Sequence, residues 1–311
     1  MANNLLLRII LAAIGTVVLF AALIFLPFAG LPMAAIGLAY GLMQAALVAL
    51  VSMVLLWLLT ASSLAIAFGF LFAIPILVTL RQALLSRQLT DGSFEFYPID
   101  RLIILVIALC SGGAALIFLS MGGEAGLPQA FADALASSPE INQLLGQMYS
   151  LSGPEDMLRI ANIMLITGFA SWPLLVVGNL QIAQALLVKT TLNLRPPTDY
   201  ERLQLPQGLS LILGVFLLVA VFANGAMATL FAALAAIVLS AYFLLGLAII
   251  HAISRDWNAR GFFLAGLYFL IFMMAWVIIP VSLMGLLDTR FDFRKLNQRP
   301  DKPSDETGDE E

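Results

Sequence analysis

Long stretches without a charged side chain are the feature that most constrains what this chain can fold into. Five runs contain no Asp, Glu, Lys or Arg: 9–80, 102–123, 160–188, 203–254 and 261–287. A helix needs about 20 apolar residues to cross the hydrocarbon core of a bilayer, so each run is long enough for at least one crossing. Only 11% of the residues are charged, against about 25% in soluble domains. We therefore predict an all-α fold, a polytopic bundle of transmembrane helices.

Glycine and proline residues divide these runs into about eight predicted spans, within a range of roughly seven to nine. The predicted spans cover 5–27, 33–58, 62–80, 101–120, 159–188, 208–223, 226–251 and 261–286. A break near Tyr40-Gly41-Leu42 would divide the second span into a short helix and a longer one. Residues 1–288 form the predicted bundle. Residues 289–311 are a predicted basic juxtamembrane segment followed by a disordered acidic tail.

The distribution of basic residues predicts the orientation of the bundle. The 81–101 and 188–208 loops hold three Lys or Arg residues each, and the 121–158 loop holds none. Basic loops stay on the cytoplasmic side, so we place the first two there and the third outside. The basic residues of the tail then fall on the outer face unless 208–223 dips in and returns, so both arrangements of the tail stay open. The predicted location is the bacterial inner (plasma) membrane, with the lipid bilayer as the first partner.

The 121–158 loop is acidic and has its own helical pattern. Ile141, Leu144, Leu145 and Met148 recur at helical spacing after a proline. We predict one or two short amphipathic helices on the outer surface of the membrane. They would act either as a packed connector or as a lid over a central cavity.

Reactive groups are scarce. The chain has one histidine and one cysteine, and it contains no HExxH, CxxC or GxxxxGK[ST] pattern. We predict that it is not an enzyme, and we expect no cofactor, no metal and no nucleic-acid partner. The predicted spans hold no charged residue away from their ends, which argues against a carboxylate proton relay.

Neutral polar side chains inside the spans are the candidate ligand-binding residues. Lipid cannot satisfy an amide, so such groups face other helices or a wet cavity. They either join helices or line a pocket for a small neutral solute. The candidates are Trp172, Asn179, Gln181, Gln184, Gln44 and Asn224.

Small residues recur every four positions in the second span. They are Gly37, Gly41, Ala45 and Ala49. Residues four apart share a helix face, so the pattern predicts a smooth seam where a second helix packs closely.

Two segments resemble known families. "LPMAAIGLAYGLMQAALVALVSMVLLWLL", from Leu31, resembles a pattern in the substrate-binding S-components of energy-coupling-factor transporters. "GLLDTRFDFRK", Gly285 to Lys295, resembles the C-terminal signature of the YybS-like family of uncharacterised bacterial membrane proteins, and the segment with Asn224, Tyr242 and Gly246 fits the same family.

These resemblances imply a membrane solute-binding role, without a specific activity or ligand residue to carry over. Asp288 and Arg294 match the terminal motif of the YybS-like family, and their simplest role is interfacial anchoring. We therefore predict a non-catalytic membrane protein that serves as a solute-binding or transport component. The alternative is a structural or assembly factor that binds other membrane proteins.

Overall fold

The computed structural model describes residues 2–90, 92–121, 126–149, 153–190, 192–198 and 200–294. The described chain forms two compact units. Unit 1 holds Met1–Thr198 and Gly208–Ala241, and unit 2 holds Asp199–Gln207 and Tyr242–Glu311. The predicted disordered tail beyond residue 294 lies outside the described residues.

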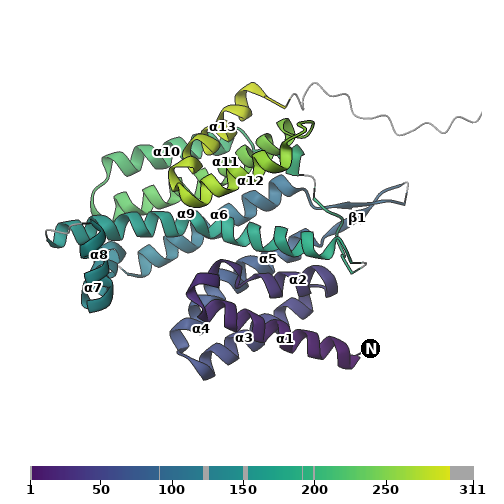
Figure 1. The fold of residues 1–311 in the computed structure, drawn as a ribbon, viewed down its shortest axis with the longest axis horizontal. Helices are drawn as coiled ribbons and strands as arrows, with labels where there is room; N and C mark the ends of the chain where they lie inside the picture. The colour runs from purple at the N-terminus through teal and green to yellow at the C-terminus, as the bar shows by residue number, and fades with distance from the viewer. Residues whose placement is uncertain are drawn as a thin grey trace, which may run out of the picture. The chain divides into compact units, whose positions relative to one another are not determined.

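Nearly all of unit 1 is helical (Figure 1). Its first half contains α1 (Ala2–Ala21), η1 (Leu23–Phe28), α2 (Leu31–Tyr40), α3 (Leu42–Leu59), α4 (Ser62–Phe68), the π-helical η2 (Gly69–Ala73) and α5 (Ile74–Ala83). Its second half contains α6 (Ile99–Ser120), α7 (Gly126–Ser137), α8 (Pro139–Tyr149), α9 (Pro154–Leu187), α10 (Gly208–Phe222) and the first part of α11 (Gly225–Ile253). The end of α11 belongs to unit 2, together with η3 (Tyr200–Arg202), α12 (Arg260–Met273), η4 (Ala275–Val277) and α13 (Ile278–Phe291).

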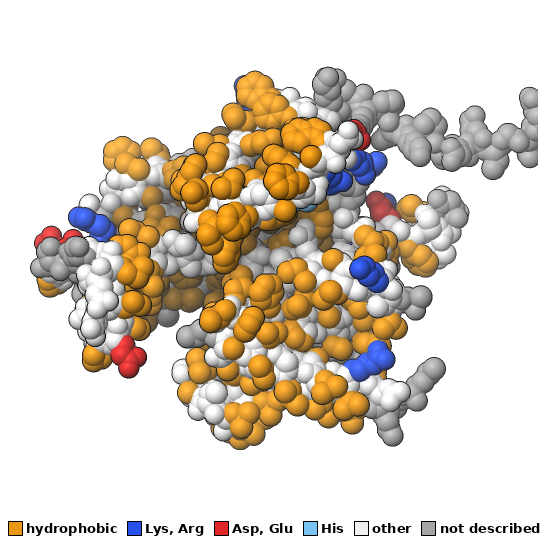
Figure 2. Space-filling model, viewed as in Figure 1, with side chains coloured by type: hydrophobic (Ala, Val, Ile, Leu, Met, Phe, Trp, Pro, Cys, Tyr) orange, Lys and Arg blue, Asp and Glu red, His pale blue; other side chains and the backbone are white. Residues whose placement is uncertain are grey.

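The chain is a helical, multi-pass membrane protein. Six of the described helices are long and apolar enough to span a bilayer, or seven spans if α12 and α13, which meet at a 119° bend, are counted as one broken span. The space-filling view shows hydrophobic side chains over most of the visible face, as expected for a surface in contact with lipid (Figure 2). The structure thus supports six or seven spans rather than eight. One reason is α10, whose 15 residues extend only about 22 Å against a hydrocarbon core of about 30 Å.

The helix predicted over 33–58 is broken at Gly41, as the alternative prediction allowed. Gly41 lies between α2 and α3 with φ 100°, a left-handed conformation that side chains other than glycine rarely adopt. The predicted seam is therefore divided, with Gly37 on α2 and both Ala45 and Ala49 on α3. The structure does not form a single four-residue face, because the helix axis does not continue through Gly41.

Gly37 still allows close packing, against Leu80 of α5 and Ala45 of α3. A Cβ on Gly37 would meet Leu80 at 2.5 Å and the Ala45 methyl at 3.1 Å. A Cβ on Gly41 would meet only the Gln44 amide oxygen, at 3.4 Å. Gly37 is thus needed for space, whereas Gly41 is needed for its backbone conformation.

Both basic loops of unit 1 lie at the same end of its helices. Arg195, in the 188–208 loop, is buried and donates from its two terminal nitrogens to the carbonyls of Ala83 and Tyr97, each at 2.9 Å. The 81–101 loop also forms a hairpin that the sequence analysis did not predict, β1 (Ser86–Gln88) paired antiparallel with β2 (Phe94–Phe96). Helices α7 and α8 lie at the opposite end of α6 and α9 (Figure 1). This arrangement agrees with the predicted separation of basic and acidic loops, and the cytoplasmic location of the basic end stays a prediction.

Candidate functional site

Trp172 fills a slot inside unit 1. Its indole N–H donates to the Leu71 carbonyl at 2.7 Å. Its ring lies against Gly113, where an added Cβ would come within 2.5 Å of the ring. The Leu71 carbonyl is available because Pro75, four residues later, has no N–H with which to continue the helix. Local winding also changes here, since Leu71 lies in the π-helical segment η2. Trp172 thus holds α9 against the irregular part of the third span.

Asn179, further along α9, also joins this helix to another part of unit 1. Its side-chain nitrogen donates to the Pro27 carbonyl at 2.8 Å and to the Leu175 carbonyl at 2.7 Å. Pro27 lies near the end of η1, where helix-end carbonyls lack a partner within the helix. The side chain is 2% exposed, as predicted for an amide that lipid cannot satisfy.

The other predicted amides lie in separate places. Gln184 donates to the Pro196 carbonyl at 2.7 Å and accepts from the Thr198 hydroxyl at 3.3 Å, which fixes the following loop against α9. Gln44 is half-buried in the first turn of α3, and Gln181 is half-buried on α9. Asn224 is exposed in the turn between α10 and α11, outside both helices. The contacts of Trp172, Asn179 and Gln184 join elements of unit 1, while the side-chain oxygen of Asn179 has no hydrogen-bond partner among the described residues. The ligand-binding role of the six candidates stays a prediction.

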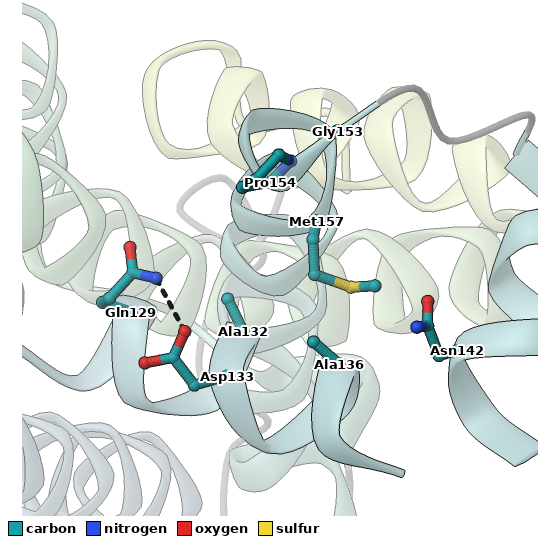
Figure 3. Close-up of a pocket in the computed structure, with 8 residues that line it drawn as sticks. All are labelled: Gln129, Ala132, Asp133, Ala136, Asn142, Gly153, Pro154 and Met157. Atoms are coloured by element: carbon teal, nitrogen blue, oxygen red, sulfur yellow. Dashed lines mark hydrogen bonds between the residues drawn. The ribbon is translucent and has the colours of Figure 1, made fainter. Parts of the chain in front are cut away.

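A cavity lies elsewhere in unit 1, between α7, α8 and the start of α9. Its volume is about 400 Å³. Figure 3 shows Gln129 and Asp133 on one side, Met157 in the middle and Asn142 on the other side. The remaining lining residues are Ala132, Ala136, Gly153 and Pro154. We take this cavity as the candidate functional site.

The floor of the cavity is fixed by a small apolar core. Ala132 and Leu135 of α7 pack with Leu145 of α8 and with Met157 and Ala161 of α9, and all five are buried. Proline begins α8, and both Pro154 and two acidic residues stand in the first turn of α9, as is usual for helix N-termini. Residues of α7, α8 and α9 therefore pack around one apolar core, and the polar lining residues belong to these same helices.

Hydrogen-bond acceptors dominate the polar lining of the cavity. Gln129 donates its side-chain amide to Asp133 at 2.8 Å, four residues along α7, so its carbonyl oxygen still has acceptor capacity. Asp133 is the only charged lining residue among those described, and the 121–158 segment contains no Lys or Arg. The cavity is therefore suited to a small solute that offers hydrogen-bond donors, including an ammonium group.

The length and charge pattern of α9 lead us to expect the cavity outside the hydrocarbon core. Its 34 residues extend about 51 Å, more than the roughly 30 Å of the core. The uncharged run 160–188 can hold the membrane part, and the first turn carries Glu155 and Asp156. Gly153, Pro154 and Met157 line the cavity, so the cavity lies at the charged N-terminal end of α9, which we expect to project beyond the hydrocarbon.

Unit 2 contains a buried ion pair at the end of α13. Arg294 contacts Asp288 at 2.8 Å, and their side chains are 3% and 4% exposed. The second oxygen of Asp288 accepts from the Phe293 N–H at 2.8 Å, and Arg294 also donates to the Leu203 carbonyl at 2.6 Å. We expected both residues to act as interfacial anchors. They bind each other and fix the chain after α13, where pairing and hydrogen bonds offset the cost of burial. Their role as interfacial anchors stays a prediction.

The residues of the cavity were missed by the sequence analysis, which searched the spans for polar groups. The available signal was the pair Gln129 and Asp133, which lie four residues apart just after Pro128 in the 121–158 loop. Within the described residues, no group of three or more His, Cys, Asp or Glu side chains is placed to hold a metal ion.

Comparison with models of known protein families, with curated proteins and with solved structures gave no match for this chain.

Proposed function

We propose that the chain is a non-catalytic integral membrane protein of the YybS-like type that binds a small solute, as a component similar to the S-components of energy-coupling-factor transporters. The bacterial inner membrane is the proposed location. The family assignment rests on the sequence motifs from Leu31 and from Gly285 to Lys295. The solute-binding role rests on the α7–α9 cavity.

One observation carries this proposal. A cavity of about 400 Å³ stands at the N-terminal end of α9, beside a buried apolar core and with polar side chains in its wall. A volume of this size matches small-molecule sites, which begin near 300 Å³. Asp133, the Gln129 carbonyl and the Asn142 amide supply a few convergent polar groups, as such sites require.

The experiment is native mass spectrometry of the full chain purified in mild detergent. We expect a small molecule to be retained by the wild type and lost from Asp133→Asn and from Asn142→Ala. Gln147→Ala is the control, because Gln147 is exposed on α8 and does not line the cavity. Equal small-molecule content in the wild type and in Asp133→Asn would refute the solute-binding role at this site.

One feature favours the alternative, a structural or assembly factor. Helix α12 has no buried residue, and it exposes Phe262, Phe269 and Phe272 by 86%, 62% and 81%. Either a partner helix or lipid can cover such a surface. Crosslinking from photoreactive residues at these positions distinguishes an assembly factor from a solute-binding protein. A protein adduct supports the assembly factor, and lipid adducts alone argue against it and favour the solute-binding role.

A further inference from the structure

Helix α8 has a hydrophobic face that the described part of the chain leaves uncovered. At about 100° per residue, Ile141, Leu144, Leu145, Met148 and Tyr149 lie on one side of the helix. Only Leu145 is buried, in the core shared with α7 and α9. The other four side chains are between 42% and 63% exposed. The opposite side of the helix carries Glu140, Gln143 and Gln147.

The place where α8 packs fixes its depth relative to the membrane. Leu145 lies in the same core as Met157 and Ala161 of α9. These two residues flank the point where the charged beginning of α9 changes to the uncharged run 160–188. Charged side chains are costly inside the hydrocarbon, so we expect the boundary between headgroups and hydrocarbon near this point. The uncovered face of α8 therefore stands at the level of the membrane interface.

The composition of α8 also suits this position. Amphipathic helices at the interface bury their apolar face by about 5–10 Å, and tyrosine is enriched at that depth because its ring is apolar and its hydroxyl is polar. Tyr149 is at the end of the apolar face. The helix has no Lys or Arg, so apolar burial rather than attraction to anionic lipid would hold it.

We propose that α8 is an interfacial helix, seated on the outer membrane surface with Ile141, Leu144, Met148 and Tyr149 inserted into the lipid. The seating is a contact with the bilayer and not with a protein partner. Because α8 also supplies Asn142 to the cavity, the lipid surface then supports one wall of that cavity. The lipid contact stands whether or not the cavity binds a solute.

The test uses the full chain without its native cysteine, reconstituted into phosphatidylcholine vesicles. Met148→Cys and Gln143→Cys are labelled with the same environment-sensitive fluorophore in detergent before reconstitution. The two positions are both exposed and lie on opposite sides of one short helix, so they form a matched pair.

We expect the probe at residue 148 to emit at shorter wavelength, to be quenched by brominated lipid, and to show several-fold weaker quenching by aqueous iodide than the probe at residue 143. Equal iodide quenching at both positions would overturn the proposal. Protection of residue 148 from iodide without quenching by brominated lipid would also overturn it, because a protein would then cover the face. Unchanged lipid quenching in Asp133→Asn would show that this contact is separate from solute binding.

Discussion

A close helix crossing in unit 2 predicts that one small substitution destabilises the protein. Gly285 of α13 lies against α11 so tightly that an added Cβ would overlap the Tyr242 carbonyl oxygen and come within 2.9 Å of the Gly246 nitrogen. A Cβ on Gly246 would in turn overlap the Val281 carbonyl oxygen. The atoms in the way are backbone atoms, so no side-chain rotation relieves the overlap.

We expect Gly285→Ala to lower the free energy of unfolding by about 1–3 kcal/mol, the cost of forcing one extra carbon into a packed site. The upper part of that range applies here, because one helix must move away from the other. Alanine gains up to about 1 kcal/mol over glycine in an isolated helix. That gain is smaller in a span, where the chain stays helical when the helices separate.

Gly266→Ala is the matched control. Gly266 lies on α12, in the same unit, and an added Cβ there would meet no atom within 4 Å. Its unfolding free energy should stay within about 0.5 kcal/mol of the wild type. The measurement is denaturation of the purified protein in mixed detergent micelles, followed by circular dichroism. Equal stability of the Gly285→Ala and Gly266→Ala variants would refute the close crossing.

Three further predictions follow from the same structure. Trp172→Phe should destabilise the protein by about 1–3 kcal/mol, because it leaves a buried carbonyl without its donor, and unchanged stability would mean that the indole bond is dispensable. Asp288→Ala should lower the free energy of unfolding by about 3–5 kcal/mol, because it leaves Arg294 buried and unpaired. The double variant Asp288→Ala with Arg294→Leu should recover part of that loss, and no recovery would argue against a buried pair. In a cysteine-free background, Ser93→Cys should resist an impermeant thiol reagent applied to intact cells while Ser138→Cys reacts; the reverse pattern would invert the predicted orientation.

The local parts of the fold could be predicted from sequence, and the long-range contacts could not. Uncharged runs identified the long helices. The 121–158 pattern predicted one or two short helices, and the structure has two, α7 and α8. The amide of Asn179 was recognised as needing a partner, but the carbonyl that it binds belongs to a residue 152 positions earlier. No periodicity in one segment contains that information.

The glycines show the same limit of prediction from sequence. Spacing by four identified Gly41 as a packing residue, but its φ of 100° shows that it ends a helix. The glycines that allow two backbones to approach, Gly246 and Gly285, come from different helices. Their spacing along the chain therefore gives no pattern. A helix face can be read from spacing only where the helix is continuous, and glycine is one of the residues that interrupts it.

Three buried polar residues of unit 1 share one structural purpose, and this changes where a binding site should be sought. Trp172, Asn179 and Arg195 each donate to a carbonyl that a helix end or a proline has left without its usual partner. In a membrane, broken helices need such donors because water is absent. The donor groups of these three side chains are thus used by the fold, whereas the side-chain oxygen of Asn179 has no hydrogen-bond partner among the described residues. Polar residues beyond the hydrocarbon core, such as Asp133 and Asn142, are not required for that purpose, so the cavity that they line is the stronger candidate for recognition of a solute.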